Sequence, residues 1–185
     1  MKPVLVVLAH PYPDRSRANR ALTRGISELP GVETRSLYDL YPDFSIDVDE
    51  EQAALARANL VVWQHPVYWY TVPALMKLWF EKVLTIGWAY GQGGTALRGK
   101  RCLWVATLGG DASDYSDAGN HQGPLERFVP VVQQTARFCG MEWLEPLLVT
   151  AAHRVSDDDL AAAAATYRSR ITALAAESES DVPHA

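Results

Sequence analysis

Short apolar runs that recur along the chain constrain its fold more than any other feature. Residues 4–8 (VLVVL), 60–64 (LVVWQ) and 102–107 (CLWVAT) are apolar almost throughout. A strand that alternates apolar and polar residues buries one face, whereas a continuous apolar run is typical of a strand buried on both faces. The sequence therefore predicts a sheet that is covered by helices on both sides.

Segments with helical periodicity alternate with these runs. The helices that we expect cover residues 18–29, 49–58, 74–84, 124–139 and 156–176. Two further strands are expected at residues 32–38 and 143–150. Five strands that alternate with helices predict an α/β doubly wound parallel sheet, and with five strands the flavodoxin-like order 2-1-3-4-5 is the natural arrangement.

The length and composition fit one domain. A chain of 185 residues, 48% of them hydrophobic, buries about 70% of its unfolded surface when it folds as a single unit. We expect this domain to cover residues 1–176, and the polar residues 177–185 to form a disordered tail. The sequence contains no internal repeat and no long linker that would divide two domains.

Charge and cysteine usage exclude several classes of protein. The formal net charge is −5 and the longest basic cluster is residues 98–101 (RGKR), which argues against a nucleic-acid-binding face. Cys102 and Cys139 lack metal-binding spacing, and two thiols in a chain of this size favour a reducing compartment over a disulfide framework. The N-terminal apolar run is too short for a signal peptide, and no run reaches the roughly 18 residues of a membrane span. We therefore expect a soluble, cytoplasmic protein.

The loops that leave three of the predicted strands are the most unusual parts of the sequence. In an open parallel sheet, ligands bind beyond the carboxyl ends of the strands, where the strand order reverses. For the order 2-1-3-4-5 this switch lies between the first and third strands. The loops concerned are HPYPDRSRAN, HPVYWYTVP and TLGGDASDYSDAGNH. The fold and the loop composition thus indicate the same place for a ligand site.

The first of these loops carries residues that suit a phosphate group. Ser16, Ala18 and Asn19 begin a predicted helix, whose free N–H groups and partial positive charge favour an anion. Arg15 or Arg17 could add a positive charge. The alternative is that Ser16 only caps the helix, which is a common role for serine.

The other two loops carry aromatic and glycine residues. Gly109 and Gly110 would let backbone N–H groups approach a ligand closely, and Tyr115 and His121 are either proton donors or ordinary surface residues. The aromatic run at residues 68–70 forms either a flat wall or part of the core, and a strand-to-helix turn cannot bury all three side chains on one face. A phosphorylated planar cofactor, FMN or FAD, fits these features together.

Two nucleotide motifs and a metal site are rejected. Residues 94–100 (GTALRGK) fit the pattern GxxxxGK, but Arg101 replaces the magnesium-binding Ser/Thr, and a strand follows where a P-loop needs a helix. The first strand is not followed by GxGxxG, which disfavours a Rossmann dehydrogenase. Asp111, Asp114 and Asp117 do not have the spacing of an EF-hand. We expect no metal site.

Five motifs in the same order resemble the NAD(P)H:quinone oxidoreductase (DT-diaphorase-like) flavoproteins. They are HPYPDRSRAN, LYPDFSIDVDEEQAAL, WQHPVYWYTVPALMKLWFEKV, GWAYGQGGTALRGK and TLGG, spread over about the first 150 residues. Within that family the chain is most similar to the ancillary flavoproteins of the Kef glutathione-gated potassium-efflux systems. The resemblance implies a flavodoxin-like homodimer with flavin at the dimer interface, and FMN more than FAD.

The resemblance also implies roles for individual residues. Contacts on the phosphate side are implied for His10, Ser16, Arg17, Ala18 and Asn19. Contacts with the flavin ring are implied for Val67, Tyr68, Trp69, Tyr70, Thr107, Leu108, Gly109 and Gly110. Tyr115 and His121 are implied to assist hydride transfer.

The implied reaction is a two-electron, ping-pong transfer of hydride from NAD(P)H to a quinone or similar electrophile through the flavin. A cytoplasmic protein of this kind could also lie at the inner membrane through a Kef-type channel partner. Two alternatives stay open at this stage. The protein is purely a regulator that binds the cytoplasmic domain of a channel, or it is a one-electron carrier like flavodoxin.

Overall fold

In the computed structural model, which describes residues 2–176, the expected parallel sheet is confirmed. The strand order is β2-β1-β3-β4-β5, and an additional strand, β6, also pairs with β4. The predicted tail at residues 177–185 lies outside the described residues. The flavodoxin-like order places the ends of β1 and β3 next to each other, at the predicted switch point.

The central strands are buried along their whole length, except for the partly buried Arg101 at the start of one of them. They are β1 (Val4–Leu8), β3 (Leu60–Pro66) and β4 (Arg101–Thr107), and β2 (Val32–Ser36) lies at one edge. Side chains alternate between the two faces of the sheet, as they must in extended backbone. Val4 and Val6 therefore belong to one hydrophobic cluster, and Leu5 and Val7 to the other.

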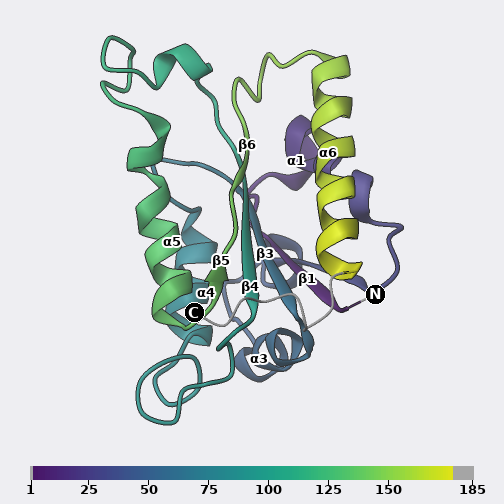
Figure 1. Cartoon of the computed structure of the whole chain (residues 1–185), viewed down its shortest axis with the longest axis vertical. Coiled ribbons are helices and arrows are strands. Elements are labelled where there is room, and N and C mark those ends of the chain that lie inside the picture. Colours follow the sequence, from purple (N-terminus) through teal and green to yellow (C-terminus); the bar gives the residue numbers. More distant parts are fainter. Residues whose placement is uncertain (1, 177–185) are drawn as a thin grey trace.

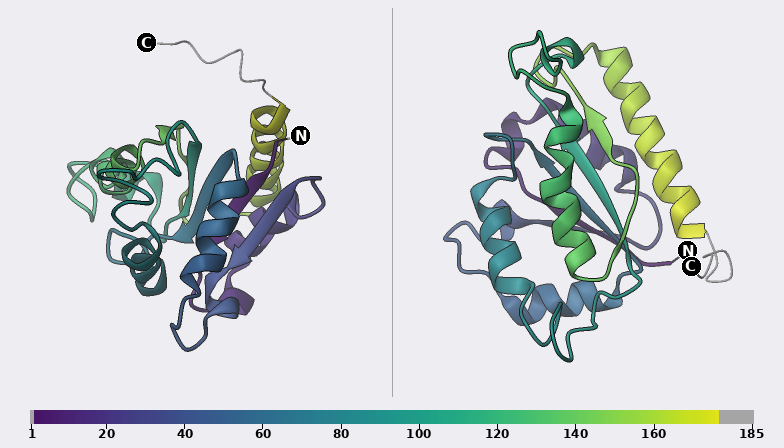
Figure 2. Two further views of the ribbon diagram at one scale, coloured as in Figure 1. Left: turned by 90° about the horizontal axis from the view of Figure 1, so that it is seen from below. Right: turned by 60° about the vertical axis from the view of Figure 1, so that its left-hand side comes forward.

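Helices cover both faces of the sheet, as Figures 1 and 2 show. One face packs against α1 (Arg17–Ile26) and α6 (Asp157–Ala176), and the other packs against α3 (Val48–Arg57), α4 (Ala74–Val83) and α5 (Val129–Phe138). Ser156 caps the start of α6, because its Oγ accepts a hydrogen bond from the Asp159 N–H over 3.0 Å. Both faces of the sheet thus bury apolar side chains, which accounts for the continuous apolar runs.

The prediction of one continuous fifth strand is wrong. Residues 143–150 instead contribute to two short strands, β5 (Glu142–Trp143) and β6 (Leu147–Val149), which both pair with β4 in parallel. Pro146 lies in the gap between them. Proline has no N–H to donate to a neighbouring strand, so the hydrogen-bond ladder is interrupted there.

Two other predicted boundaries also differ from the structure. The second strand ends at Ser36, and the short helix α2 (Leu37–Leu40) follows it. The helix predicted at residues 124–139 is divided into a 3₁₀ turn, η3 (Leu125–Arg127), and α5. Pro130 occupies the first turn of α5, where its missing N–H costs no intrahelical bond. The remaining 3₁₀ turns are η1 (Pro13–Arg15) and η2 (Ala112–Asp114).

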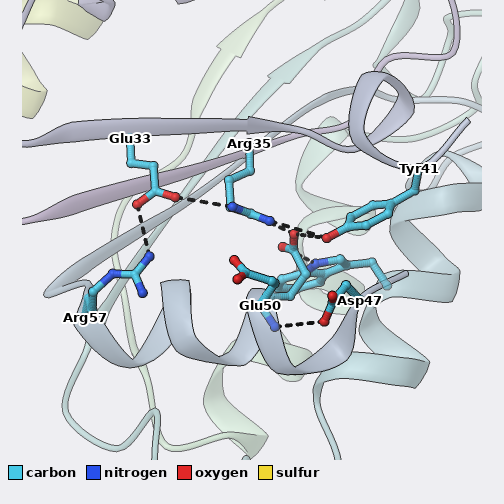
Figure 3. A network of polar contacts seen from close by, with 8 residues as sticks. Glu33, Arg35, Tyr41, Asp47, Glu50 and Arg57 are labelled. Carbon is cyan, nitrogen blue, oxygen red and sulfur yellow. Dashed lines mark hydrogen bonds and ion pairs between the residues drawn. The ribbon is translucent and has the colours of Figure 1, made fainter. Parts of the chain in front are cut away.

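A buried carboxylate joins β2 to the helices of one face. Glu51 of α3 is fully buried, and its oxygens accept hydrogen bonds from Arg35 Nε, the Tyr41 hydroxyl and Trp79 Nε1, each over 2.7 Å. Figure 3 shows Arg35 and Tyr41 directed toward this helix. A buried charge is tolerated only when it is paired and hydrogen-bonded, and here both oxygens are satisfied.

The α6 helix is long, but neither it nor any other helix in residues 2–176 combines the length and hydrophobicity that crossing a membrane requires.

Candidate functional site at the sheet switch point

A cavity of about 470 Å³ opens at the carboxyl ends of β1, β3 and β4. Its lining comes from the loops that follow these strands and from the segment that joins β6 to α6. The lining residues are His10, Tyr12, Arg15, Ser16, Arg17, Ala18, Pro66, Val67, Tyr68, Thr107, Leu108, Gly109, Ala152 and His153. The cavity is therefore at the switch point where the sequence indicated a ligand site.

The N-terminus of α1 forms one end of this cavity. Ser16 is the N-cap of α1, and its Oγ accepts a hydrogen bond from the Asn19 N–H over 3.3 Å. The first N–H groups of a helix have no intrahelical acceptor, and the helix dipole is positive there. Because Arg17 and Ala18 of this first turn line the cavity, this end suits an anionic group. Ser16 acts both as a cap and as a lining residue.

Asn19 lies beneath the cavity and does not line it. Its side chain is buried, and Nδ2 donates a hydrogen bond to Thr107 Oγ1 over 2.9 Å. Gln64 Nε2 donates to the Asn19 carbonyl over 3.2 Å, and Gln64 Oε1 accepts from the Tyr167 hydroxyl over 3.2 Å. This network connects α1, β3, β4 and α6, so Asn19 fixes the start of α1 relative to the ends of the strands.

His10, at the end of β1, presents a defined ring nitrogen to the cavity. The Tyr12 N–H donates to His10 Nδ1 over 3.0 Å, so Nδ1 is an acceptor and Nε2 carries the proton of the neutral ring. Burial lowers the pKa of His10 from its usual value of 6.5 and thus favours this neutral form. His10 can therefore act as a hydrogen-bond donor without bringing a positive charge.

His65 supports the cavity from below. Its ring is completely buried, and Nε2 accepts a hydrogen bond from Trp104 Nε1 over 2.8 Å. An indole N–H can only donate, so the proton of His65 lies on Nδ1, which donates to the Pro66 carbonyl over 2.9 Å. Burial lowers the pKa of His65 to about 4. A neutral imidazole thus holds the peptide that leads to the lining residue Val67.

The aromatic run at the end of β3 forms a tight turn. Tyr68 and Thr71 exchange two backbone hydrogen bonds of 3.1 Å, and the two residues between them have positive φ angles, 50° at Trp69 and 65° at Tyr70. These are the features of a type I′ turn, which normally takes Asn and Gly. Tyr68 lines the cavity, whereas Trp69 is 91% exposed and outside the lining. Residues held in this strained conformation cluster at functional sites.

Tyr70 is not part of the cavity lining and belongs to a second group of aromatic rings. It stacks on Phe128 with ring centroids 5.1 Å apart, and its edge meets His121 at 5.6 Å. The rings of Tyr115 and His121 stack with a centroid distance of 4.3 Å. The predicted pair is therefore brought together by the loop that follows β4.

Gly110 connects this pair to the cavity. A Cβ atom at Gly110 would lie 2.9 Å from His121 Nε2 and 3.2 Å from Tyr115 Cε2, so any other residue would displace both rings. His121 Nδ1 is buried and has no hydrogen-bond partner within residues 2–176. Burial, and then the charge of Asp114, raises the pKa of Tyr115, so this phenol keeps its proton at neutral pH. Neither the Tyr115 nor the His121 side chain lines the cavity, but Gly109, which precedes Gly110 in the chain, does.

The carboxylates of the same loop have partners within the protein. Asp111 pairs with Arg154 over 2.7 Å, and Asp114 Oδ1 accepts from Asn120 Nδ2 over 2.7 Å. Asp117 lies 3.7 Å from Arg127. In the described part of the chain, no group of three His, Cys, Asp or Glu residues is arranged to hold a metal ion. The GTALRGK segment precedes β4 and so lies at the opposite end of that strand from the cavity.

Sequence reasoning missed four lining residues: Tyr12, Pro66, Ala152 and His153. The last two belong to the segment after β6, which ends at the same edge of the sheet as the other strands. The rule that ligands bind beyond strand ends would have found them if it had been applied to the fifth predicted strand. Arg17, which was predicted, does line the cavity, but its guanidinium also pairs with Asp157.

Comparison with known proteins agrees with this architecture. Residues 2–171 match the family described as having a flavodoxin-like fold. The glutathione-regulated potassium-efflux system ancillary protein KefF of Salmonella typhimurium is 49% identical over 170 residues, which cover 92% of this chain and 96% of that protein.

Solved structures give the same picture. The general stress protein 14 of Treponema denticola, in complex with FMN, superposes with a TM-score of 0.86 at 30% identity, covering 93% of this chain and 99% of that one. A protein from Klebsiella pneumoniae named as a candidate quinone reductase superposes with a TM-score of 0.80 at 26% identity, covering 94% of this chain and 85% of that one.

Proposed function

Because the chain belongs to the flavodoxin-like family and is similar in sequence to the KefF ancillary proteins, we propose that it is an FMN-dependent NAD(P)H:quinone oxidoreductase. One observation carries the proposal. The N-terminus of α1, the glycine loop after β4 and the aromatic turn after β3 all meet in one cavity at the switch point of the sheet. A phosphate, a polar ring edge and a flat ring face each find a suitable surface there.

The residues of the cavity fit FMN. The first turn of α1 with Ser16 would hold the phosphate, and the neutral His10 would donate to it from Nε2. Gly109 leaves room for a ring edge, and Tyr68 would border the ring. The structural relative bound to FMN supports this cofactor in preference to FAD. When bound, FMN takes a hydride from NAD(P)H and passes two electrons to a quinone.

Tyr115 and His121 would supply hydrogen-bond donors at the polar edge of the bound ring. The raised pKa of Tyr115 keeps its hydroxyl protonated at neutral pH, so it can donate throughout the physiological range. The imidazole of His121 is held by stacking on Tyr115, and its Nδ1 makes no bond inside the described chain. We assign His121 to donate a hydrogen bond where negative charge develops on the ring.

The acceptor would enter beside the aromatic turn. Trp69 and Tyr70 are held by the type I′ turn with their side chains substantially exposed, at 91% and 47%. Flat, partly apolar side chains favour a planar quinone, and the turn keeps them in place without a cover of core residues.

A groove between α4 and α5 supports the proposal of a homodimer. Its volume is about 550 Å³, and its lining includes Phe80, Leu84, Tyr90, Val131 and Phe138. Val131 and Phe138 are 60% and 64% exposed, which is unusual for apolar side chains gathered on one surface. We propose that a second copy of the chain covers this groove and that the cavity borders the resulting interface.

The test of the proposed reaction begins with the purified protein. We expect a yellow protein, or one that takes up FMN, and FMN-dependent oxidation of NADH or NADPH when a quinone is present. A protein that binds no flavin contradicts the proposal. A one-electron carrier of the flavodoxin type would bind FMN but would not oxidise NAD(P)H with a quinone.

We also propose that the protein assists a Kef-type potassium channel by binding its cytoplasmic domain, which would bring it to the inner surface of the membrane. The sequence similarity to KefF supports this role. Co-purification with the channel domain and potassium-efflux assays test it. If the His121→Ala variant loses quinone reduction but still activates efflux, the role is purely regulatory. If both activities disappear together, the reductase is part of activation.

A further inference from the structure

The segment that joins β6 to α6, residues 150–156, forms a wall of the cavity to which no function has been given so far. Ala152 and His153 of this segment line the cavity. The Ala151 N–H donates to the Gly110 carbonyl over 2.7 Å, and the Ala152 N–H donates to the Leu108 carbonyl over 2.8 Å. Ala151 has a φ of 51°, a left-handed conformation that alanine adopts only under constraint. The segment is therefore fixed to the loop that follows β4.

A second set of contacts fixes the same segment to α1. Arg17 of the first turn of α1 donates to the Val155 carbonyl, and its guanidinium also pairs with Asp157 at the start of α6. The segment thus bridges the glycine loop and the N-terminus of α1. Ala152 and His153 of this segment therefore line the cavity between the glycine loop and the N-terminus of α1.

His153 has the polar side chain of these two lining residues. Cδ2 and Nε2 of its ring lie 3.7 Å from the position that a Cβ atom of Gly109 would occupy, so this edge of the ring faces the glycine loop. The ring is exposed and makes no hydrogen bond or ion pair with the described residues. Arg15, Arg17 and the Ser16 cap line the same cavity. An imidazole without a partner, in a cavity that Arg15 and a helix N-terminus also line, is suited to bind phosphate oxygens.

We propose that His153 binds the phosphate group of the flavin nucleotide, as a donor from the β6–α6 segment that completes the anion end of the cavity. This assignment rests on the proposed function, because it takes the phosphate to be that of FMN. His10 would meet the phosphate from the end of β1, whereas His153 would meet it from the β6–α6 segment. The group would then be held from three elements of the fold: the loop after β1, the first turn of α1 and the β6–α6 segment.

Binding of FMN and of riboflavin to the purified chain, followed by flavin fluorescence, tests the assignment. Riboflavin has the same ring as FMN but no phosphate, so it separates the two ends of the cavity. We expect His153→Ala to weaken FMN binding about tenfold, the usual effect of losing one charge-assisted hydrogen bond. Riboflavin binding should stay within about twofold of the unchanged chain, because no phosphate contact is lost.

Arg24→Gln is the matched control. Arg24 lies on α1 and is exposed but does not line the cavity, so its replacement removes a positive charge near the same helix without removing a contact. We expect it to leave the affinity for FMN unchanged. His153→Arg, which keeps a phosphate donor at this position, should retain FMN binding. The circular dichroism spectrum and the melting temperature of each variant verify that it is folded.

Three results would overturn the assignment. His153→Ala could bind FMN as tightly as the unchanged chain, it could weaken riboflavin as much as FMN, or Arg24→Gln could produce the same loss. An equal loss for riboflavin would mean that His153 contacts the ring. An equal loss in Arg24→Gln would mean that the effect comes from the overall positive charge and not from a contact. If the unchanged chain binds neither flavin, the proposed function is wrong. If it binds FMN but His153→Ala does so equally well, only the assignment of His153 is wrong.

Discussion

Trp104 of β4 and His65 of β3 are joined by a 2.8 Å hydrogen bond in which the indole N–H donates to the imidazole Nε2. The bond leaves His65 only one way to carry its proton, on Nδ1 toward Pro66. Two neighbouring strands are thus linked through side chains just below the cavity, in addition to their backbone ladder. The link depends on the neutral state of the histidine.

This link predicts a loss of stability in acid. The pKa of His65 is lowered to about 4 in the folded chain, against 6.5 for an ordinary histidine. Between these values the unfolded chain binds a proton that the folded chain does not, so stability is complete above pH 6.5 and falls as the pH decreases toward 4. The full loss is on the order of 3 kcal/mol. Urea denaturation at several pH values measures the slope.

The pKa of His10 is also lowered, so His10 contributes to the same dependence of stability on pH. The contribution of His65 therefore has to be measured separately. NMR titration of the histidine ring protons does this. The His65 signal should remain that of a neutral ring at pH 5.5, and a His65 transition near 6.5 would contradict the prediction.

Arg35→Met should destabilise the fold by about 3 kcal/mol, because it leaves the Glu51 carboxylate buried without its countercharge. The measurement is urea denaturation at neutral pH. Arg57→Met is a suitable control, since Arg57 is 59% exposed and meets Glu33 only at 3.5 Å. Exposed pairs of this kind contribute about 0–1 kcal/mol. Equal losses in the two variants would show that the buried pair has no special weight.

We expect that removing the strain of the aromatic turn makes the protein more stable but less active. Replacing Trp69 and Tyr70 by Asn and Gly, the residues that type I′ turns favour, should raise the free energy of unfolding by about 1–3 kcal/mol through relief of strain. The same variant should reduce quinone more slowly, because the exposed rings are lost. Tyr12→Gly is the comparison for stability alone, because Tyr12 is 61% exposed with a φ of −132° and carries no such strain, but it lines the cavity. A double variant of unchanged or lower stability would contradict the argument.

Thr107→Val should cost about 1–3 kcal/mol, since valine keeps the shape but leaves the buried Asn19 amide without its acceptor. Because Asn19 fixes the start of α1, flavin affinity should fall as well. Thr172→Val removes a hydroxyl that donates to the Arg168 carbonyl on an exposed part of α6, and it should change little. If the flavin affinity of Thr107→Val is unchanged, the buried hydrogen-bond network does not contribute to flavin binding.

The homodimer proposed for the α4–α5 groove is tested by Phe138→Asp. Phe138 lines the groove and is 64% exposed, so a carboxylate there should prevent burial against a second copy. We expect the mass measured by light scattering to fall from that of a dimer to that of a monomer. Phe44→Asp places the same charge at an exposed aromatic outside the groove and should leave the mass unchanged. If the unchanged protein already has the mass of a monomer, the proposed homodimer is wrong.

The strand order and the position of the cavity could be predicted because they depend on patterns within each segment. The apolar runs at β1, β3 and β4 are read directly as buried strands, and the switch point then follows from the order. The break at Pro146 was predictable in principle from the missing N–H, yet the apolar residues on either side concealed it.

The site required contacts between distant segments that periodicity does not report. The role of Asn19 beneath the cavity depends on Thr107, which is 88 residues away in the sequence. His153 comes beside Gly109 only because Arg17 and the backbone of residues 108–110 hold its segment. The positive φ angles of Trp69 and Tyr70 could not be expected either, since turn propensities favour other residues there.

The divided strand after α5 also affects how the folded chain behaves in a crowded solution. An uninterrupted strand at the margin of a sheet offers a template onto which other chains can add. Here one margin ends in pieces of two and three residues, and the opposite margin, β2, carries Glu33 and Arg35. Neither edge of the sheet therefore offers a long apolar strand with which a strand of another chain could pair. The exposed large apolar side chains accordingly lie in turns and helices, as at Trp69 and Phe138, and not along a strand at either margin.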